Sequence, residues 1–161
     1  LCSGSGCIGI VISKENDNMD VTLSDVSEKA LEICNRNRKK LDSPADIIKL
    51  DLNSKFTSKI KYDIIVSNPP YLSYIHSDEM GKNVKFEPNI ALFAPLNNSL
   101  HFYEKILEFS LSNLNKNGQI YLEINPIFIK DFNELLLRFK PNDINFRDDF
   151  RGKKRLVKLS F

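Results

Sequence analysis

The stretch YDIIVSNPPY, residues 62–71, decides how the rest of the chain is interpreted. Its unbroken apolar centre predicts a β-strand over residues 62–67, inside a sheet that is covered on both faces. Two consecutive prolines then end the strand, because each ring fixes φ and removes a backbone N–H. The residue before each proline is held extended as well. We therefore expect outward-facing carbonyl groups beside the amide of Asn68 and the ring of Tyr71.

A rigid pair of hydrogen-bond acceptors beside an aromatic ring is suited to holding a planar –NH2 group. The candidate catalytic residues are therefore Asn68, Pro69, Pro70 and Tyr71. Two prolines in a row more often mark a plain strand-ending turn, which is the alternative interpretation. The catalytic interpretation is favoured because a glycine-rich loop comes earlier in the chain.

Strands and helices alternate on both sides of this stretch. Helices are predicted from Gly6 to about Lys14 and over residues 28–41, about 100–114 and 126–139. Asn117-Gly118 is expected to end the third of these helical units. Strands are predicted over residues 21–25, 45–50, 62–67, 120–124, 144–148 and 155–161. The last two strands are joined by a tight polar turn. This order predicts a doubly wound, Rossmann-like α/β fold, with a mostly parallel sheet and a C-terminal antiparallel hairpin.

Composition is that of an ordinary globular domain. The chain has 161 residues, 42% of them hydrophobic and 27% charged, with a net charge of +2. These values predict a single domain, and the charge is too small to argue for a nucleic-acid partner. No apolar run is long enough for a membrane span. Three cysteines without CxxC spacing indicate neither a disulfide framework nor a zinc site, and no metal ligands are predicted. We expect a cytoplasmic protein.

The start of the chain carries a candidate nucleotide-binding loop, GSGCIG at residues 4–9, which fits G-x-G-x-x-G. Asp25 follows at the end of the next predicted strand, where its carboxylate could accept hydrogen bonds from both hydroxyls of a ribose. Asp51 and Leu52 follow the third strand, and Asp51 could accept a hydrogen bond from the exocyclic amine of the base. A cap of a helix or turn is the alternative for Asp51.

This pattern fits either a dinucleotide or S-adenosylmethionine. Asn-Pro-Pro-Tyr favours S-adenosylmethionine, because hydride transfer needs no group that holds an amide. The predicted cofactor-binding residues are Gly4, Ser5, Gly6, Asp25, Asp51, Leu52 and Asn68.

With these motifs the chain resembles the catalytic domain of the glutamine-specific protein methyltransferases that modify peptide-chain release factors (the HemK/PrmC family). The resemblance covers essentially all 161 residues. It is carried by the glycine loop, Asp25, Asp51, Asn68-Pro69-Pro70-Tyr71, Phe86-Glu87-Pro88 with Ala91-Leu92, and Asp149-x-x-Gly152-x-x-Arg155. Asn-Pro-Pro-Tyr is shared with adenine DNA methyltransferases, whereas the last two motifs are more specific.

The chain departs from the family in two respects. The family has a helical N-terminal domain and an acid-bearing first strand before the glycine loop. We expect residues 1–161 to be a fragment that lacks both. After Glu123 the chain continues with Asn125-Pro126, where many relatives have a glycine-containing turn.

The resemblance implies S-adenosylmethionine-dependent methylation of a glutamine side-chain nitrogen, in the Gly-Gly-Gln motif of a release factor. Asn68 and the Pro69 carbonyl would hold the amide, and Tyr71 would pack on it. The segment from residue 72 to about 98 is long enough to be a lid or substrate-binding insert, with Phe86, Glu87 and Pro88 as substrate-binding candidates. A loop-stabilising role is the alternative for Glu87. His76 is more typical of an exposed loop residue.

The expected partner is a release factor as protein substrate, for a monomeric enzyme that acts neither at a membrane nor directly on nucleic acid. Two alternatives stay open. One is an adenine-specific DNA or RNA methyltransferase, which would need a target-recognition domain and a basic, aromatic groove. The other is an inactive, truncated remnant of the family.

Overall fold

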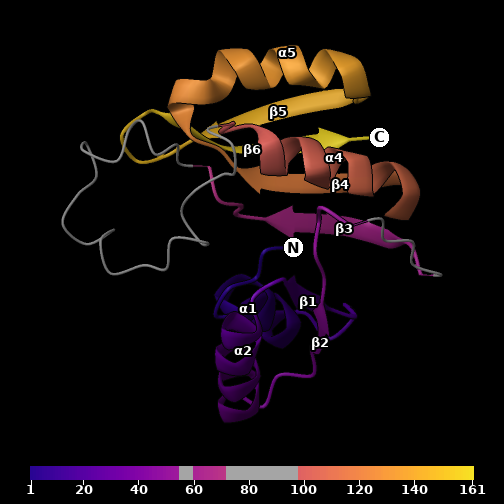
Figure 1. The fold of residues 1–161 in the computed structure, drawn as a ribbon, viewed down its shortest axis with the longest axis vertical. Coiled ribbons are helices and arrows are strands. Elements are labelled where there is room, and N and C mark those ends of the chain that lie inside the picture. Colours follow the sequence, from indigo (N-terminus) through magenta and orange to yellow (C-terminus); the bar gives the residue numbers. More distant parts are fainter. Residues whose placement is uncertain (55–59, 72–97) are drawn as a thin grey trace. The chain divides into compact units, whose positions relative to one another are not determined.

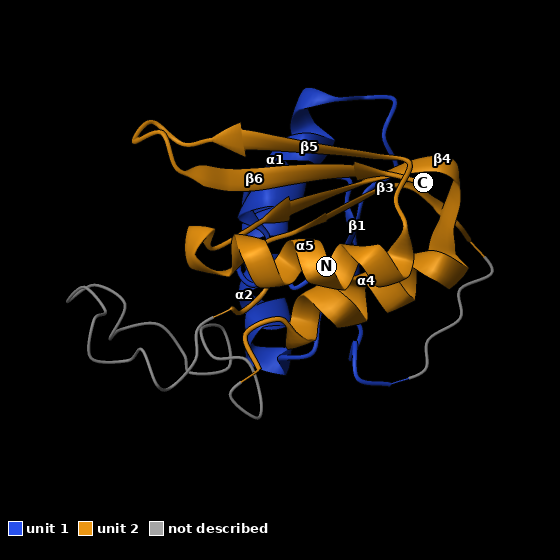
Figure 2. Ribbon diagram, turned by 90° about the horizontal axis from the view of Figure 1, so that it is seen from above, with its two compact units in different colours: residues 1–56 blue, residues 57–161 orange. Residues whose placement is uncertain are grey.

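The computed structural model describes residues 1–54, 60–71 and 98–161. The chain divides into two compact units, Leu1–Phe56 and Thr57–Phe161 (Figure 2). The first unit contains α1 (Cys7–Glu15), β1 (Thr22–Asp25), α2 (Glu28–Lys40) and β2 (Asp46–Lys49) (Figure 1). All four elements lie within one or two residues of their predicted ranges.

The first unit is a β-α-β crossover preceded by a short helix. β1 and β2 pair in parallel from Thr22↔Asp46 to Asp25↔Lys49. Parallel neighbours need a crossover connection, which α2 supplies. As predicted, Ser27 caps α2, because its hydroxyl accepts a hydrogen bond from the Ala30 N–H at 3.3 Å. The small core is formed by Ile10, Leu23, Cys34 and Ala45, with Val21 and Ile47 packed against it.

The close approach of α1 to β1 depends on Gly9. A Cβ atom at this position would lie 2.1 Å from Cδ2 of Leu23, a core residue that is only 4% exposed. The third glycine of the loop therefore serves the packing of the helix on the strand.

The second unit contains β3 (Tyr62–Ser67), α4 (His101–Asn113), β4 (Leu114–Glu123), the 3-10 helix η4 (Pro126–Phe128), α5 (Ile129–Phe139), β5 (Asp143–Asp148) and β6 (Lys154–Ser160). Its four-stranded sheet has the order β3-β4-β6-β5. β3 and β4 are parallel, and β6 is antiparallel to both of its neighbours. The predicted C-terminal hairpin is confirmed, and α4 and α5 cover one face of the sheet (Figure 2).

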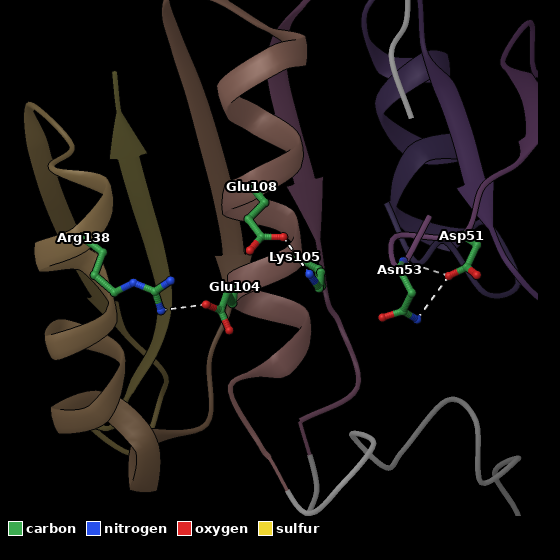
Figure 3. A network of polar contacts seen from close by, with 6 residues as sticks. All are labelled: Asp51, Asn53, Glu104, Lys105, Glu108 and Arg138. Carbon is green, nitrogen blue, oxygen red and sulfur yellow. Dashed lines mark hydrogen bonds and ion pairs between the residues drawn. The ribbon is translucent and has the colours of Figure 1, made fainter. Parts of the chain in front are cut away.

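The core of the second unit lies between this sheet and its two helices. Tyr103 of α4 and Phe132 of α5 meet edge to face, with ring centroids 5.3 Å apart. The fully buried strand residues are Ile120, Leu122, Val157 and Leu159. At the surface, Arg138 of α5 and Glu104 of α4 form an ion pair at 2.6 Å (Figure 3).

One boundary in this unit differs from the prediction. The helix ends at Asn113, and the strand begins at Leu114 and not at residue 120. Asn117, at φ +65°, lies within β4, where the pairing jumps from Tyr62↔Leu114 to Ile64↔Gln119. Asn-Gly therefore forms a bulge inside the strand and does not end the helical unit. Pairing with Tyr62 extends the strand back to the helix.

The next helix begins as predicted at Pro126, with one 3-10 turn before α5. Asn125 caps this turn, because its side-chain oxygen accepts a hydrogen bond from the Ile127 N–H at 3.1 Å. The Asn125-Pro126 pair thus has a local structural role.

Candidate functional site

The glycine loop is fixed to the end of β1 and to α2. The Ser3 N–H donates a hydrogen bond to the Ser24 carbonyl at 2.9 Å, and the Gly6 N–H donates to the Ser3 carbonyl at 2.8 Å. The Asn37 amide of α2 donates to the Ser5 carbonyl at 2.9 Å. The loop is therefore held in one shape by its own unit.

Both predicted cofactor-binding glycines have positive φ. Gly4 lies at φ +54° and Gly6 at +85°, a region that other residues rarely adopt. A Cβ on Gly4 would point into open space, whereas one on Gly6 would lie 2.6 Å from Sγ of Cys34. Gly4 thus leaves backbone open to an approaching ligand, while Gly6 is required by the packing of α2.

Asp25 links the glycine loop to α2. Its Oδ2 accepts a hydrogen bond from the Gly4 N–H at 2.9 Å, and its Oδ1 accepts one from the Ser27 N–H at 2.9 Å. A carboxylate has about four acceptor positions, so two are left for a ligand. The structure therefore brings Asp25 and the loop together, as the sequence predicted.

Asp51 follows β2 and shapes the turn after it (Figure 3). Its Oδ1 accepts hydrogen bonds from the backbone N–H and the side-chain amide of Asn53, at 2.9 and 3.1 Å. This is the turn-capping role that the sequence left open. The contact of Asp51 with a base, and that of half-buried Leu52 with the cofactor, stay predictions.

The NPPY segment (residues 68–71) directly follows β3. Pro69 and Pro70 are buried, while Asn68 is exposed. An exposed amide thus precedes two buried rings at the end of a strand, and the outward-facing carbonyl groups stay a prediction. Tyr71 is half-buried, and its hydroxyl donates a hydrogen bond to Oε1 of Glu123 at 3.3 Å.

Glu123, at the end of β4, is a contact of the NPPY segment that was not predicted. Its backbone carbonyl accepts a hydrogen bond from the Tyr103 hydroxyl at 3.1 Å. Burial, followed by the Glu123 charge, raises the pKa of Tyr71, whereas Arg155 lowers it. Burial also raises the pKa of Tyr103. Both phenols therefore stay protonated at neutral pH and act as hydrogen-bond donors.

Several predicted positions lie outside the described residues. These are Phe86, Glu87, Pro88 and His76. In the described ranges no group of three or more His, Cys, Asp or Glu side chains could hold a metal ion. The helices within those ranges are also too short or too polar to span a membrane.

The first unit offers hydrogen-bond acceptors and open space for a nucleoside cofactor. Open backbone at Gly4 and the remaining acceptor positions of Asp25 lie at the carboxyl end of β1, where ligands bind in open α/β sheets. The residues present therefore fit a ribose-containing cofactor.

The family pattern of the methyltransferase small domain matches residues 1–84. The chain belongs to this family. Because the match covers both the glycine loop and the NPPY segment, it accounts for the two motifs together.

Curated relatives are similar over nearly all of this chain. A release factor glutamine methyltransferase of Flavobacterium psychrophilum is 40% identical over 99% of the chain and 56% of the relative. One of Bacteroides thetaiotaomicron is 35% identical over 96% of the chain and 56% of the relative. A bifunctional methyltransferase of Rickettsia bellii is 34% identical over 99% of the chain and 29% of the relative. The chain thus spans about half the length of the release factor methyltransferases that it matches.

Solved methyltransferase structures share the fold. A methyltransferase from Pyrococcus furiosus matches with a TM-score of 0.69 at 20% identity, over 99% of this chain and 71% of that one. The N-terminal domain of human METTL16 in complex with SAH matches with a TM-score of 0.61 at 16% identity, over 99% and 58%. The predicted Rossmann-like class I methyltransferase fold is confirmed.

Proposed function

We propose that the protein transfers a methyl group from S-adenosylmethionine to the side-chain nitrogen of a glutamine in a peptide-chain release factor, in its Gly-Gly-Gln motif. The observation that carries this proposal is the similarity to release factor glutamine methyltransferases over 99% of the chain, at 40% identity. The exposed amide of Asn68 beside buried prolines supports the same chemistry.

The cofactor follows from the family and from the first unit. The methyltransferase fold, and a structural neighbour solved with SAH, support S-adenosylmethionine. Asp25 would accept hydrogen bonds from the ribose, and the loop from Gly4 to Gly6 would receive the rest of the ligand. Asp51 and Leu52 would border the base, and Asn68 would border the methyl-bearing end.

The NPPY segment would do the chemical work by positioning. A glutamine nitrogen is a weak nucleophile, because its lone pair is delocalised into the carbonyl. The Asn68 side-chain oxygen and the Pro69 carbonyl would each accept a hydrogen bond from one N–H of the glutamine amide. The Tyr71 ring would pack on the flat face of that amide. Such positioning can supply about 7–11 kcal/mol of the barrier. Bound S-adenosylmethionine supplies a methyl group on a positively charged sulfur.

Fixed acceptors also favour the charge that develops on nitrogen as the new N–C bond forms and the C–S bond breaks. Once it carries the positive charge, the methylated amide is acidic enough to give its extra proton to water. The NPPY segment therefore needs no strong base beside it, and the histidines need no catalytic role.

The wider setting is part of the same proposal. Residues 1–161 would form the catalytic domain of a longer protein, because the chain covers 56% of its relative from Flavobacterium psychrophilum. The enzyme acts as a monomer in the cytoplasm, and Phe86, Glu87 and Pro88 contact the protein substrate.

The test is methyl transfer by the full-length protein from labelled S-adenosylmethionine, with a purified release factor, adenine-containing DNA and RNA offered separately. Label in the release factor alone is the expected result. Label in nucleic acid alone would replace the proposal with an adenine methyltransferase. Failure to bind the cofactor at all would indicate an inactive remnant of the family.

A further inference from the structure

One motif from the sequence has no role in the proposed chemistry. In the motif Asp149-x-x-Gly152-x-x-Arg155, Asp149 and Gly152 lie in the turn between β5 and β6, and Arg155 lies at the start of β6. Asp149 Oδ1 accepts hydrogen bonds from the backbone N–H groups of Arg151 and Lys153, at 2.9 and 3.0 Å. Gly152 lies at φ +71°, and its N–H donates to the Asp149 carbonyl at 2.9 Å. The turn is therefore closed on a single carboxylate.

The same carboxylate orients Arg155. Asp149 Oδ2 lies 3.7 Å from Nε of Arg155, and the Asp149 side chain is only 15% exposed. The Arg155 carbonyl accepts a hydrogen bond from the Ile124 N–H at 2.8 Å, which fixes the start of β6 against the end of β4. Both the backbone and the side chain of Arg155 are thus held in place.

Arg155 lies on the same depression as Glu123, which is the hydrogen-bond partner of Tyr71 in the NPPY segment. Glu123, Asp149 and Arg155 line one open depression at this edge of the sheet. The Tyr71 hydroxyl donates a hydrogen bond to Glu123, and the positive charge of Arg155 lowers the pKa of that hydroxyl. Glu123 is held from α4 as well, because the Tyr103 hydroxyl donates a hydrogen bond to the Glu123 backbone carbonyl.

This arrangement matters because the Tyr71 side chain can rotate, although the two prolines before it fix the backbone. A ring that packs on a substrate amide must keep its orientation, and the hydroxyl at its far end is the point at which it can be held. The Glu123 carboxylate accepts a hydrogen bond from this hydroxyl, and the Arg155 guanidinium lines the same depression as that carboxylate.

We propose that Arg155 and Glu123 are positioning residues for methyl transfer, which hold the Tyr71 hydroxyl and so fix the ring that packs on the substrate amide. Asp149 and Gly152 form the turn that aims Arg155. This inference rests on the proposed function, since it assigns Tyr71 the substrate contact described above.

The test is a double-mutant cycle in the full-length protein with a release factor as substrate. Arg155→Met should lower kcat by about 10- to 100-fold, the scale of loss expected from misplaced reacting groups. In a Tyr71→Phe background, which lacks the hydroxyl, the same substitution should cause little further loss. The KM for S-adenosylmethionine should not change. Arg151→Met is the matched control, because the Arg151 side chain lies over the exposed Phe150 ring in the same turn.

A second readout follows the Tyr71 phenol itself. Its pKa is measured by NMR of Cζ-labelled tyrosine. The Tyr71 signal is assigned as the one that disappears in Tyr71→Phe. Arg155→Met removes a positive charge and should raise this pKa, whereas Glu123→Gln removes a negative charge and should lower it. A merely structural role for Arg155 would not move the two values in opposite directions.

Equal losses of kcat in both backgrounds, or a Tyr71 pKa that is unchanged in both variants, would overturn the inference. If the wild type methylates no release factor, the proposed function fails on its own. The opposite pKa shifts then still decide whether Arg155 and Glu123 hold the Tyr71 hydroxyl.

Discussion

At the residue scale, the predicted site depends on side chains that lie on backbone held in place by other contacts. Asp25 joins the glycine loop to α2 through two hydrogen bonds and keeps acceptor positions for a ligand. Asn68 is exposed directly before two buried prolines. In both cases the surrounding backbone is fixed by groups other than the ligand, which is the condition for preorganised binding.

Replacing Asp25 by alanine should weaken cofactor binding first. Each charge-assisted hydrogen bond contributes about 1.5–3 kcal/mol, so losing the ribose contacts should raise the Kd for S-adenosylmethionine by about 10²-fold or more. Calorimetric titration of Asp25→Ala, with the exposed Asp20→Ala as control, measures this. A Kd equal to that of the wild type would show that the ribose is bound elsewhere.

Replacing Asn68 by alanine should slow methyl transfer far more than it weakens cofactor binding. Removal of one fixed hydrogen-bonding group from an active site costs about 10²–10³-fold in kcat. Asn145, exposed on β5, provides a matched Asn→Ala control in the same unit. Rates from single-turnover methyl transfer should fall only for Asn68→Ala, and an unchanged rate would remove Asn68 from the mechanism.

At the scale of elements, most boundaries could be predicted because each depends on local chemistry. Ser27 and Asn125 cap the helices that follow them, and the alternating strands of the terminal hairpin pair as expected. The start of β4 could not be predicted. Asn117-Gly118 suits a helix end and a strand bulge equally, and only the pairing of Leu114 with Tyr62 decides between them.

The approach of α1 to β1 gives a prediction at this scale. Gly9→Ala should lower the free energy of unfolding by about 1–3 kcal/mol, because its Cβ would overlap the buried Leu23 side chain. The gain in helix propensity, about 1 kcal/mol, offsets part of this cost. Chemical denaturation measures the difference.

The control for Gly9→Ala is the double variant with Leu23→Ala. Removing the Leu23 side chain should cost less in the Gly9→Ala background than in the wild type, since the overlap disappears with it. Strictly additive losses would mean that the two positions are not in contact.

At the scale of the whole molecule, the fold class and family were predictable because the motifs follow successive strand ends in a fixed order. The contact of Tyr71 with Glu123 was not predictable, because it joins residues far apart in sequence and leaves no local pattern. The role of Asp51 stayed ambiguous for a related reason, because the same side chain can cap a turn and bind a ligand. Tertiary contacts, and not propensities, decide such cases.

The central claim concerns which atom receives the methyl group. The most direct measurement is mass spectrometry of a release factor treated with the full-length protein and S-adenosylmethionine, with fragmentation of the peptide that contains Gly-Gly-Gln. We predict one added methyl group on the side-chain nitrogen of that glutamine, and none on a factor in which the glutamine is alanine. A methyl group on any other residue, or on both factors alike, would contradict the account.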